Sequence, residues 1–316
     1  MHTKLCATVG WLLLAISQLA MNTVCSAQPA DSAVARFPPV ALPDAIPHNA
    51  VALSGRWTVS VDGDGRRREL VLYPFALRPR RWLWAAAYGW TDGAMDPVPL
   101  RIENMADKVT MELTTPARVL IRAVVRADDE MAGTFEPRAG PSRAVSLKRT
   151  GQITLTEADS FADETRDFAV APTASLSKTY HAKTPLIVPG GTTITTVHLW
   201  KWLTSSNPPV VVDLLDGEPG KRHCLPGAVW AGSRFGQGQV FANDERDFAA
   251  LLNDVTSGDK ATPIVFYCLN PECWLSYNGA LRALAEGYTS VHWYRGGLHA
   301  WKAARLPMVI GDLYRP

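Results

Sequence analysis

The sequence predicts an α+β protein of two halves: an all-β meander that closes into a small barrel or sandwich, then an α/β domain with a parallel sheet. From Gly55 to about residue 156, short runs rich in β-branched and aromatic residues alternate with turn residues, and no helical period interrupts them. From Thr192 onward, apolar strand runs alternate with amphipathic helical segments. The length of 316 residues is enough for two domains, each with its own core.

The composition is that of an ordinary globular protein. Hydrophobic residues make up 47% of the chain and charged residues 20%, which excludes a fibrous or disordered chain. The formal net charge is +2, and the basic residues form only short runs. This balance gives no electrostatic reason to expect a nucleic-acid partner.

Residues 1–27 have the pattern of a cleaved export signal. Lys4 supplies the positive start, residues 9–20 are mostly apolar, and the small residues Ser26 and Ala27 precede a cleavage point before Gln28. The apolar stretch is too short to span a bilayer comfortably, and no later segment is long enough. We therefore expect an exported, periplasmic protein with no membrane span.

Residues 28–50 contain Pro38, Pro39, Pro43 and Pro47 and are predicted to be a linker. Residues 51–156 are predicted to form the β-rich domain. Its expected strands are Arg56–Val61, Glu69–Tyr73, Trp82–Trp90, Pro97–Ile102, Lys108–Leu113, Val119–Val125, Ala132–Glu136 and Ala144–Lys148.

The β-rich domain has two possible interiors. A barrel of about eight strands either holds one small ligand or is filled by its own side chains. Trp82, Trp84 and Trp90 lie close together in the sequence and are compatible with a ligand pocket or with simple core packing. Residues 157–185 are rich in Asp, Glu, Thr and Ser, so we expect a second linker with little function of its own.

Residues 186–316 are predicted to form the α/β domain. The helix after the second strand has Asn243 as its expected cap and Phe248, Leu251 and Leu252 as its apolar stripe. The expected elements, in order, are helix Val197–Thr204, strand Val210–Leu215, strand Gly227–Trp230, helix Asp244–Val255, strand Pro263–Tyr267, helix Trp274–Glu286, strand Ser290–Tyr294 and helix Leu298–Ala304.

Two cysteines stand at the junction of a predicted strand and a predicted helix. Cys268 ends the apolar run that begins at Pro263, and Cys273 comes where the next helix begins. Unpaired N–H groups at a helix N-terminus favour a thiolate over a thiol. Loss of the export signal leaves an odd number of cysteines, with Cys224 as the third. In an oxidising compartment at least one thiol then stays free or pairs outside the chain.

Several segments resemble the rhodanese-like domain over roughly residues 180–312. His223 to Ala228 is similar to its His-x-Pro-Gly-Ala turn with one extra residue, and Gly287 to Trp301 resembles its closing strand, Gly-Gly turn and Trp-bearing helix. A narrower resemblance is to rhodanese-like proteins named for a CXXCW motif and associated with PQQ-dependent alcohol catabolism. It is carried by the segments 180–191, 257–260, 266–268 and 273–278.

The resemblance implies roles for particular residues. Cys268 is then the nucleophile that attacks a sulfane donor and carries the sulfur as a persulfide, while loop N–H groups stabilise the charge. Asp213 is implied to be a structural hydrogen-bond acceptor, with His223 in the turn nearby. The implied partners are a small sulfur-containing substrate or a thiol protein and, from the narrower resemblance, a periplasmic PQQ-dependent dehydrogenase system. No cofactor is implied.

The loop that follows Cys268 departs from the rhodanese pattern. Its residues are Leu269, Asn270, Pro271, Glu272, Cys273 and Trp274. Pro271 lacks a backbone donor, and Glu272 places negative charge where an anionic donor would approach. The Arg that often follows the strand-end Asp is replaced by Leu214 or Leu215. Arg295 either supplies a positive charge to the loop or faces solvent, and Trp274 either shields the thiol or packs in the core.

Two hypotheses remain open from the sequence. In the first, the protein performs sulfurtransferase or thiol-redox chemistry through Cys268, with Cys273 as a redox partner. In the second, it is a non-catalytic binding or interaction protein whose Cys268–Cys273 disulfide stays closed, which needs Cα atoms within about 7 Å. Whether the protein is an enzyme is therefore undecided. Cys224 and His223 lack compact metal-ligand spacing, so we expect no metal site.

Overall fold

The structure is a computed structural model that describes residues 46, 48–77, 81–98, 100–105, 108–113, 119–311 and 313–314. The predicted export signal lies outside the described residues, as does most of the predicted linker 28–50. A short helix, α1 (His48–Leu53), begins within that linker. Its last residue is anchored because the indole Nε1 of Trp57 donates to the carbonyl oxygen of Leu53 at 3.0 Å.

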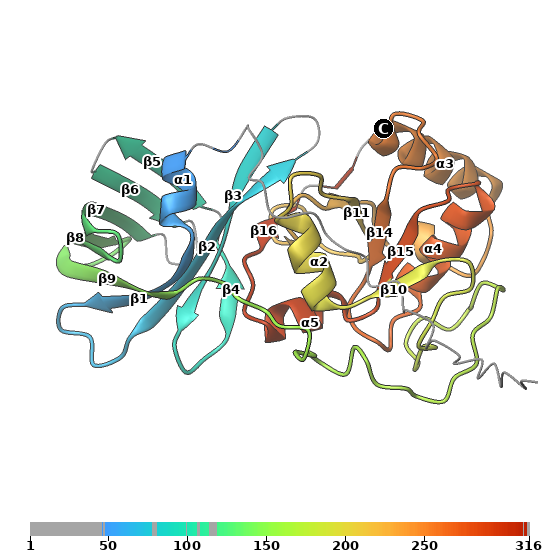
Figure 1. The fold of residues 1–316 in the computed structure, drawn as a ribbon, viewed down its shortest axis with the longest axis horizontal. Coiled ribbons are helices and arrows are strands. Elements are labelled where there is room, and N and C mark those ends of the chain that lie inside the picture. The colour runs from blue at the N-terminus through green and yellow to red at the C-terminus, as the bar shows by residue number, and fades with distance from the viewer. Residues whose placement is uncertain are drawn as a thin grey trace, which may run out of the picture. The chain divides into compact units, whose positions relative to one another are not determined.

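In the described residues of the N-terminal half, nine strands form one antiparallel sheet that curves into a half-barrel (Figure 1). The all-β N-terminal half predicted from the sequence is thereby confirmed. The strands are β1 (Gly55–Val61), β2 (Arg68–Leu77), β3 (Arg81–Trp90), β4 (Met95–Pro97), β5 (Leu100–Met105), β6 (Lys108–Leu113), β7 (Val119–Ala127), β8 (Glu130–Pro137) and β9 (Arg143–Gly151), in the spatial order β4-β3-β2-β1-β9-β8-β7-β6-β5.

Alternating burial explains why these segments form a one-sided sheet. In β1, Trp57, Val59 and Val61 are buried while the residues between them are partly exposed. Side chains of a strand alternate between its two faces, so this pattern turns one face to the core. The expected single strand Pro97–Ile102 is wrong. It is divided into β4, which pairs with β3, and β5, which pairs with β6, since prolines at 97 and 99 cannot donate to a sheet ladder.

The tryptophans of β3 do not share one environment. Trp84 packs against the core of the half-barrel, and its ring meets that of Trp82 edge to face at 5.8 Å. The ring of Trp90 lies beneath two guanidinium groups, with Arg68 4.3 Å and Arg66 4.5 Å from its centroid. Only Trp84 among these three therefore contributes to the packed interior of the half-barrel.

In the described C-terminal half, five strands form the central sheet. Its parallel arrangement was predicted, but its strand Thr192–Ile194 was not. The five strands are β10 (Thr192–Ile194), β11 (Val210–Asp213), β13 (Val229–Trp230), β14 (Ile264–Tyr267) and β15 (Val291–Tyr294), in the order β10-β15-β14-β11-β13. All their pairings are parallel. Every residue of β11 and β14 is buried, which fits a central strand covered on both faces.

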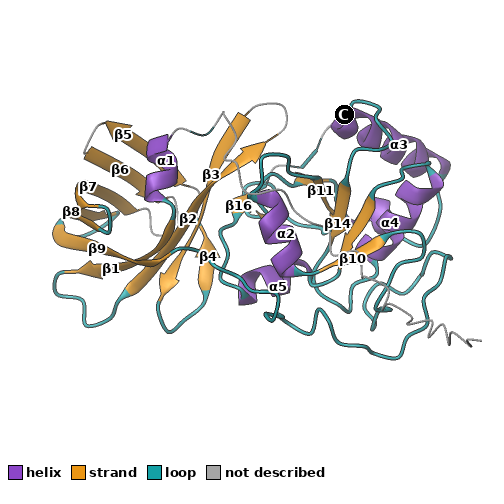
Figure 2. Ribbon diagram, viewed as in Figure 1, coloured by secondary structure: helices purple, strands orange, loops and turns teal. Residues whose placement is uncertain are grey.

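Helices cover both faces of this sheet (Figure 2). Val211 and Val265 face α2 (Thr196–Leu203) and α5 (Gly297–Ala303), because their buried residues share one core cluster. Val212 and Phe266, each the next residue in its strand, belong to the opposite cluster with α3 (Ala242–Thr256) and α4 (Leu275–Ala285). The alternation of side chains along β11 and β14 thus builds two separate cores.

Two local features differ from the sequence predictions. Helix α3 begins at Ala242, and its N-cap is Phe241 with no side-chain hydrogen bond, so the expected cap at Asn243 is wrong. A small antiparallel pair that the sequence analysis missed joins β12 (His223–Cys224) to β16 (Val309–Ile310). Two-residue strands leave too little periodicity to be recognised. Within the described residues, no helix combines the length and apolar character needed to cross a membrane.

We expect His292 on β15 to make folding sensitive to acid. Burial lowers its pKa to about 4, and its buried Nδ1 has no hydrogen-bond partner among the described residues. An unfolded histidine has a pKa near 6.5. Between about pH 6.5 and pH 4, His292 is therefore protonated in the unfolded chain but neutral in the folded chain. Its stabilising contribution is therefore present above about pH 6.5 and is lost as the pH falls towards 4.

The measurement is urea unfolding at pH 7.5, 6.0 and 5.0 for the native chain and for His292→Gln. Because glutamine does not titrate, the variant should lose less unfolding free energy between pH 7.5 and 5.0. Equal losses in the two proteins would show that another group causes the acid sensitivity.

Candidate functional site

The two loop cysteines are joined in a disulfide at the carboxyl end of the central strand. Cys268 directly follows β14, and Cys273 lies two residues before the first residue of α4. Their Cα atoms are 6.3 Å apart, within the roughly 4.4–6.8 Å that a disulfide allows. Both residues are only 1% exposed. The closed form considered from the sequence is therefore the form present in the structure.

Ser276 in the first turn of α4 is the polar side chain beside Cys268. Its Oγ is 3.0 Å from Cys268 Sγ and accepts a hydrogen bond from the indole Nε1 of Trp293 at 2.9 Å. An indole N–H only donates, and a disulfide sulfur carries no hydrogen. The Ser276 hydroxyl must therefore donate to Cys268 Sγ. The sequence analysis missed Ser276, since a serine at the start of a helix is most often a surface residue.

Three backbone amides of the loop after Cys268 already have hydrogen-bond partners. Glu272 N donates to Asn270 Oδ1 at 2.9 Å, and Cys273 N donates to the Asn270 carbonyl at 3.1 Å. Trp274 N donates to the carbonyl of Tyr180 at 3.1 Å, and Pro271 has no N–H. These four positions therefore offer no free backbone donor to an anion at Cys268.

Residues Tyr180–Thr184, which we name the cover segment, run along this loop. His181 and Cys273 form an antiparallel β-bridge, and Ala182 N donates to the Glu272 carbonyl at 3.0 Å. The backbone N and the Oγ1 of Thr184 donate to the Pro271 carbonyl at 3.1 and 2.6 Å. The stretch 157–185, expected to be a linker with little function, thus supplies a segment that bonds to the loop between the two cysteines.

Arg295 holds the cover segment in place. It is 1% exposed, its Nε donates to Thr184 Oγ1 at 3.2 Å, and its Nη2 donates to the Thr184 carbonyl at 3.2 Å. Its Nη1 donates to the Glu164 carbonyl at 2.9 Å, and its guanidinium lies 4.8 Å from the centre of the Phe168 ring. The solvent-facing alternative for Arg295 is therefore wrong, and its donors reach the loop indirectly, through Thr184, which bonds the Pro271 carbonyl.

Glu164 connects the stretch before the cover segment to the start of helix α2. Its buried carboxylate accepts from the backbone N and the Oγ1 of Thr196 at 2.8 and 2.7 Å, where α2 begins. A carboxylate at a helix N-terminus is stabilised by the unpaired amides there. Burial nevertheless raises the pKa of Glu164. The stretch before the cover segment is thus held at Glu164, whose side chain bonds to Thr196 and whose carbonyl bonds to Arg295.

Asp213 at the end of β11 is a buried acceptor, as the resemblance implies. Its Oδ2 accepts from Tyr267 OH at 2.7 Å and from Arg222 Nη2 at 2.5 Å, and its Oδ1 accepts from Leu215 N at 3.0 Å. Arg222 is therefore the positive partner of the Asp213 carboxylate, in place of the arginine that the family often has where this chain has Leu214 or Leu215. The sequence analysis missed it because Arg222 follows an intervening loop.

Three further predicted residues, His223, Leu269 and Trp274, have their own contacts in the structure. His223 is half-buried in β12, with Nδ1 3.4 Å from Lys302 Nζ, and burial is the main cause that lowers its pKa. Leu269 accepts from His299 N at 2.9 Å. Trp274 is 7% exposed and packs edge to face against Tyr277 at 4.9 Å, so it belongs to the core.

Cys224 is not a second nucleophile in this arrangement. It is fully buried, and burial together with the nearby Asp213 carboxylate raises its pKa to about 12. A thiol with such a pKa stays protonated and unreactive near neutral pH. Among the described residues there is also no group of three or more His, Cys, Asp or Glu side chains placed to hold a metal ion.

Comparison with known proteins matches residues 197–304 to the family model of the rhodanese-like domain. The chain thus contains a rhodanese-like domain preceded by a β-rich region. Two solved structures of redesigned β-barrels, one of them mFAP1 bound to DFHBI, each align with 32% of this chain at a TM-score of 0.25. The first is 18% identical over 95% of its own length, and mFAP1 is 16% identical over 98%. No curated protein matches the chain.

We expect the substitution Thr184→Val to loosen the cover segment. It removes the hydroxyl that donates to Pro271 and accepts from Arg295, and a buried donor left without a partner costs about 1–3 kcal/mol. Hydrogen exchange at the amide of Ala182 should become faster, and dithiothreitol should reduce the Cys268–Cys273 disulfide faster.

Thr289→Val is the matched control, since it removes a more exposed hydroxyl that donates to the Lys260 carbonyl at 3.4 Å. Unchanged exchange and reduction rates in Thr184→Val would show that the cover segment is held by other contacts.

Proposed function

We propose that the rhodanese-like domain performs thiol–disulfide chemistry at Cys268 and Cys273. The observation that carries this proposal is the disulfide between these residues at the position where rhodanese-like domains present their nucleophile. The Ser276 hydroxyl supports it, because a donor 3.0 Å from Cys268 Sγ stabilises negative charge on that sulfur once the bond is broken.

The chemistry needs an external thiol as co-reactant. One thiolate attacks a sulfur of the disulfide, the Cys268–Cys273 bond breaks, and a mixed disulfide forms as the other cysteine leaves as a thiolate. A second external thiolate then attacks the mixed disulfide and releases the oxidised reagent. Two thiols thus become one disulfide, and the protein gains two electrons and two protons as Cys268 and Cys273 become thiols. The reverse reaction oxidises a partner dithiol.

Sulfur transfer by the reduced form is the second candidate function, and the family match favours it. The Cys268 thiolate would attack a sulfane sulfur, break the donor's bond to its leaving group, and pass the outer sulfur to a nucleophilic acceptor. Two features rank it below redox chemistry. The amides of Glu272, Cys273 and Trp274 are bonded elsewhere, and Glu272 adds a negative charge beside the loop.

We also propose that the protein is exported to the periplasm and serves a PQQ-linked oxidation system there. An export signal in residues 1–27 would place the protein in an oxidising periplasm, and the narrower resemblance suggests service to a PQQ-linked oxidation system. Both points rest on sequence patterns alone. N-terminal sequencing of the secreted protein, with Gln28 as the expected first residue, tests the export step.

We expect native protein to show no reactive thiol towards a thiol-specific reagent, and mild reductant to expose two. Cys273→Ser should leave Cys268 able to form a stable mixed disulfide with a small thiol, because no second cysteine resolves it. Cys224→Ser is the control and should behave as the native chain, since Cys224 is buried and protonated.

Assays of sulfur transfer from thiosulfate to cyanide then distinguish redox chemistry from sulfur transfer. Thiol exchange without turnover supports redox chemistry alone, and turnover by the reduced protein that is lost in Cys268→Ser supports sulfur transfer. If mild reductant releases no thiol from the folded chain, the disulfide is inert and the non-catalytic alternative holds.

Ser276→Ala should slow alkylation of reduced Cys268 by iodoacetamide at neutral pH by roughly tenfold. The variant loses one hydrogen bond to a charged group, worth about 1.5–3 kcal/mol. Ser276→Thr, which keeps the hydroxyl, should recover most of the rate. Alkylation at the native rate in Ser276→Ala would exclude a role for this hydroxyl.

A further inference from the structure

A cavity of about 670 Å³ lies at the end of the parallel sheet opposite to the disulfide. Val210, the first residue of β11, lines it, whereas Cys268 follows the last residue of the parallel strand β14. Because β11 pairs with β14 from Val210–Ile264 to Asp213–Tyr267, these two positions are at opposite edges of the sheet. The cavity is therefore separate from the thiol chemistry proposed above.

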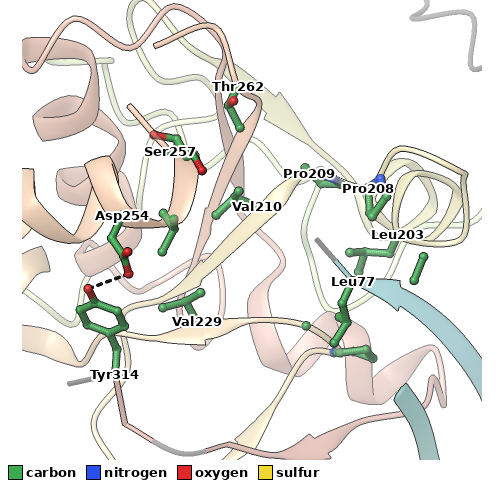
Figure 3. A pocket seen from close by; sticks show the side chains of 15 residues that line it. Leu77, Leu203, Pro208, Pro209, Val210, Val229, Asp254, Ser257, Thr262 and Tyr314 are labelled. Carbon is green, nitrogen blue, oxygen red and sulfur yellow. Dashed lines mark hydrogen bonds between the residues drawn. The ribbon is translucent and has the colours of Figure 1, made fainter. Parts of the chain in front are cut away.

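The floor and walls of the cavity are apolar. Leu203, Pro209, Val210 and Val229 line it from α2, β11 and β13 (Figure 3). Its volume lies within the roughly 300–1,000 Å³ that small-molecule sites usually have. Such a surface favours the hydrocarbon part of a ligand, because its burial removes apolar area from water.

One end of the cavity is electronegative. Tyr314 OH donates to Asp254 Oδ2 at 3.0 Å, and both side chains line the cavity beside Ser257 (Figure 3). Helix α3 ends here at Thr256, and its last turn contains no basic residue. The C-terminal end of a helix has a partial negative charge. Of the described residues that line the cavity, Asp254 is the one with a formal charge.

We propose that this cavity binds a small amphipathic cation, an organic amine or quaternary ammonium with an apolar body. The apolar body lies against Val210 and Val229, and the cationic group lies beside Asp254 at the end of α3. The carboxylate and the helix end both attract a cation and repel a carboxylate of the same shape. The Tyr314 hydroxyl fixes the carboxylate through its own hydrogen bond.

The test uses the full chain and three probes of equal chain length: octyltrimethylammonium, octanol and octanoate, each well below its aggregation limit. Isothermal titration at low ionic strength should show the cation binding most tightly and octanoate at least tenfold more weakly. In Asp254→Asn the preference for the cation over octanoate should fall by about tenfold. Asp244→Asn, in the first turn of the same helix, is the matched control and should keep the full preference.

Val229→Trp fills the apolar part and should abolish binding of all three probes. Circular dichroism of each variant checks that the fold is kept. The variant Cys268→Ser should bind octyltrimethylammonium as the native chain does, because the cavity does not depend on the thiol chemistry. The proposal is overturned if no probe binds, if octanoate binds as tightly as the cation, or if Asp254→Asn keeps the full preference.

Discussion

The complete burial of strand β14 is the constraint on which the site depends. Each of its residues, Ile264 to Tyr267, is 0% exposed, since helices cover both faces and parallel strands lie on both sides. Such a strand cannot slip by one residue without exchanging its two faces between different cores. The position of Cys268 is therefore fixed by packing. The loop that follows needs its own backbone partners, and the cover segment provides them.

Local sequence patterns predicted most of the fold and singled out the two cysteines that form the disulfide. The strands of the half-barrel and the alternation of strand and helix after Thr192 follow from periodicity, and Cys268 follows from its place after an apolar run. The contacts of Ser276 and Arg295 could not be predicted in this way. Trp293 lies 17 residues beyond Ser276, and Thr184 lies 111 residues before Arg295, so only the folded chain brings these groups together.

The contacts of residues 157–185 also could not be predicted from their polar composition. Polar residues usually indicate a solvated linker, yet here their backbone groups bond to the loop between Cys268 and Cys273 and to Arg295. The Arg222–Asp213 pair also depends on its surroundings. A Cβ at Gly217 would lie 2.4 Å from Arg222 Cδ, so a side chain at position 217 would require Arg222 to shift. Replacing one partner would leave an uncompensated buried charge.

The contacts of the cover segment have a consequence for the access of a reagent to the disulfide, which we expect the segment to slow. Cys268 and Cys273 are each 1% exposed. We therefore expect an external thiol to attack the disulfide only after the cover segment has opened. At low thiol concentration the reduction rate then depends on the open population, and at high concentration it reaches a plateau set by the opening rate itself. In the proposed thiol–disulfide chemistry, the rate at which the cover segment opens would therefore limit the rate of reduction, and the hydrogen bonds from Arg295 to Thr184 would slow that opening.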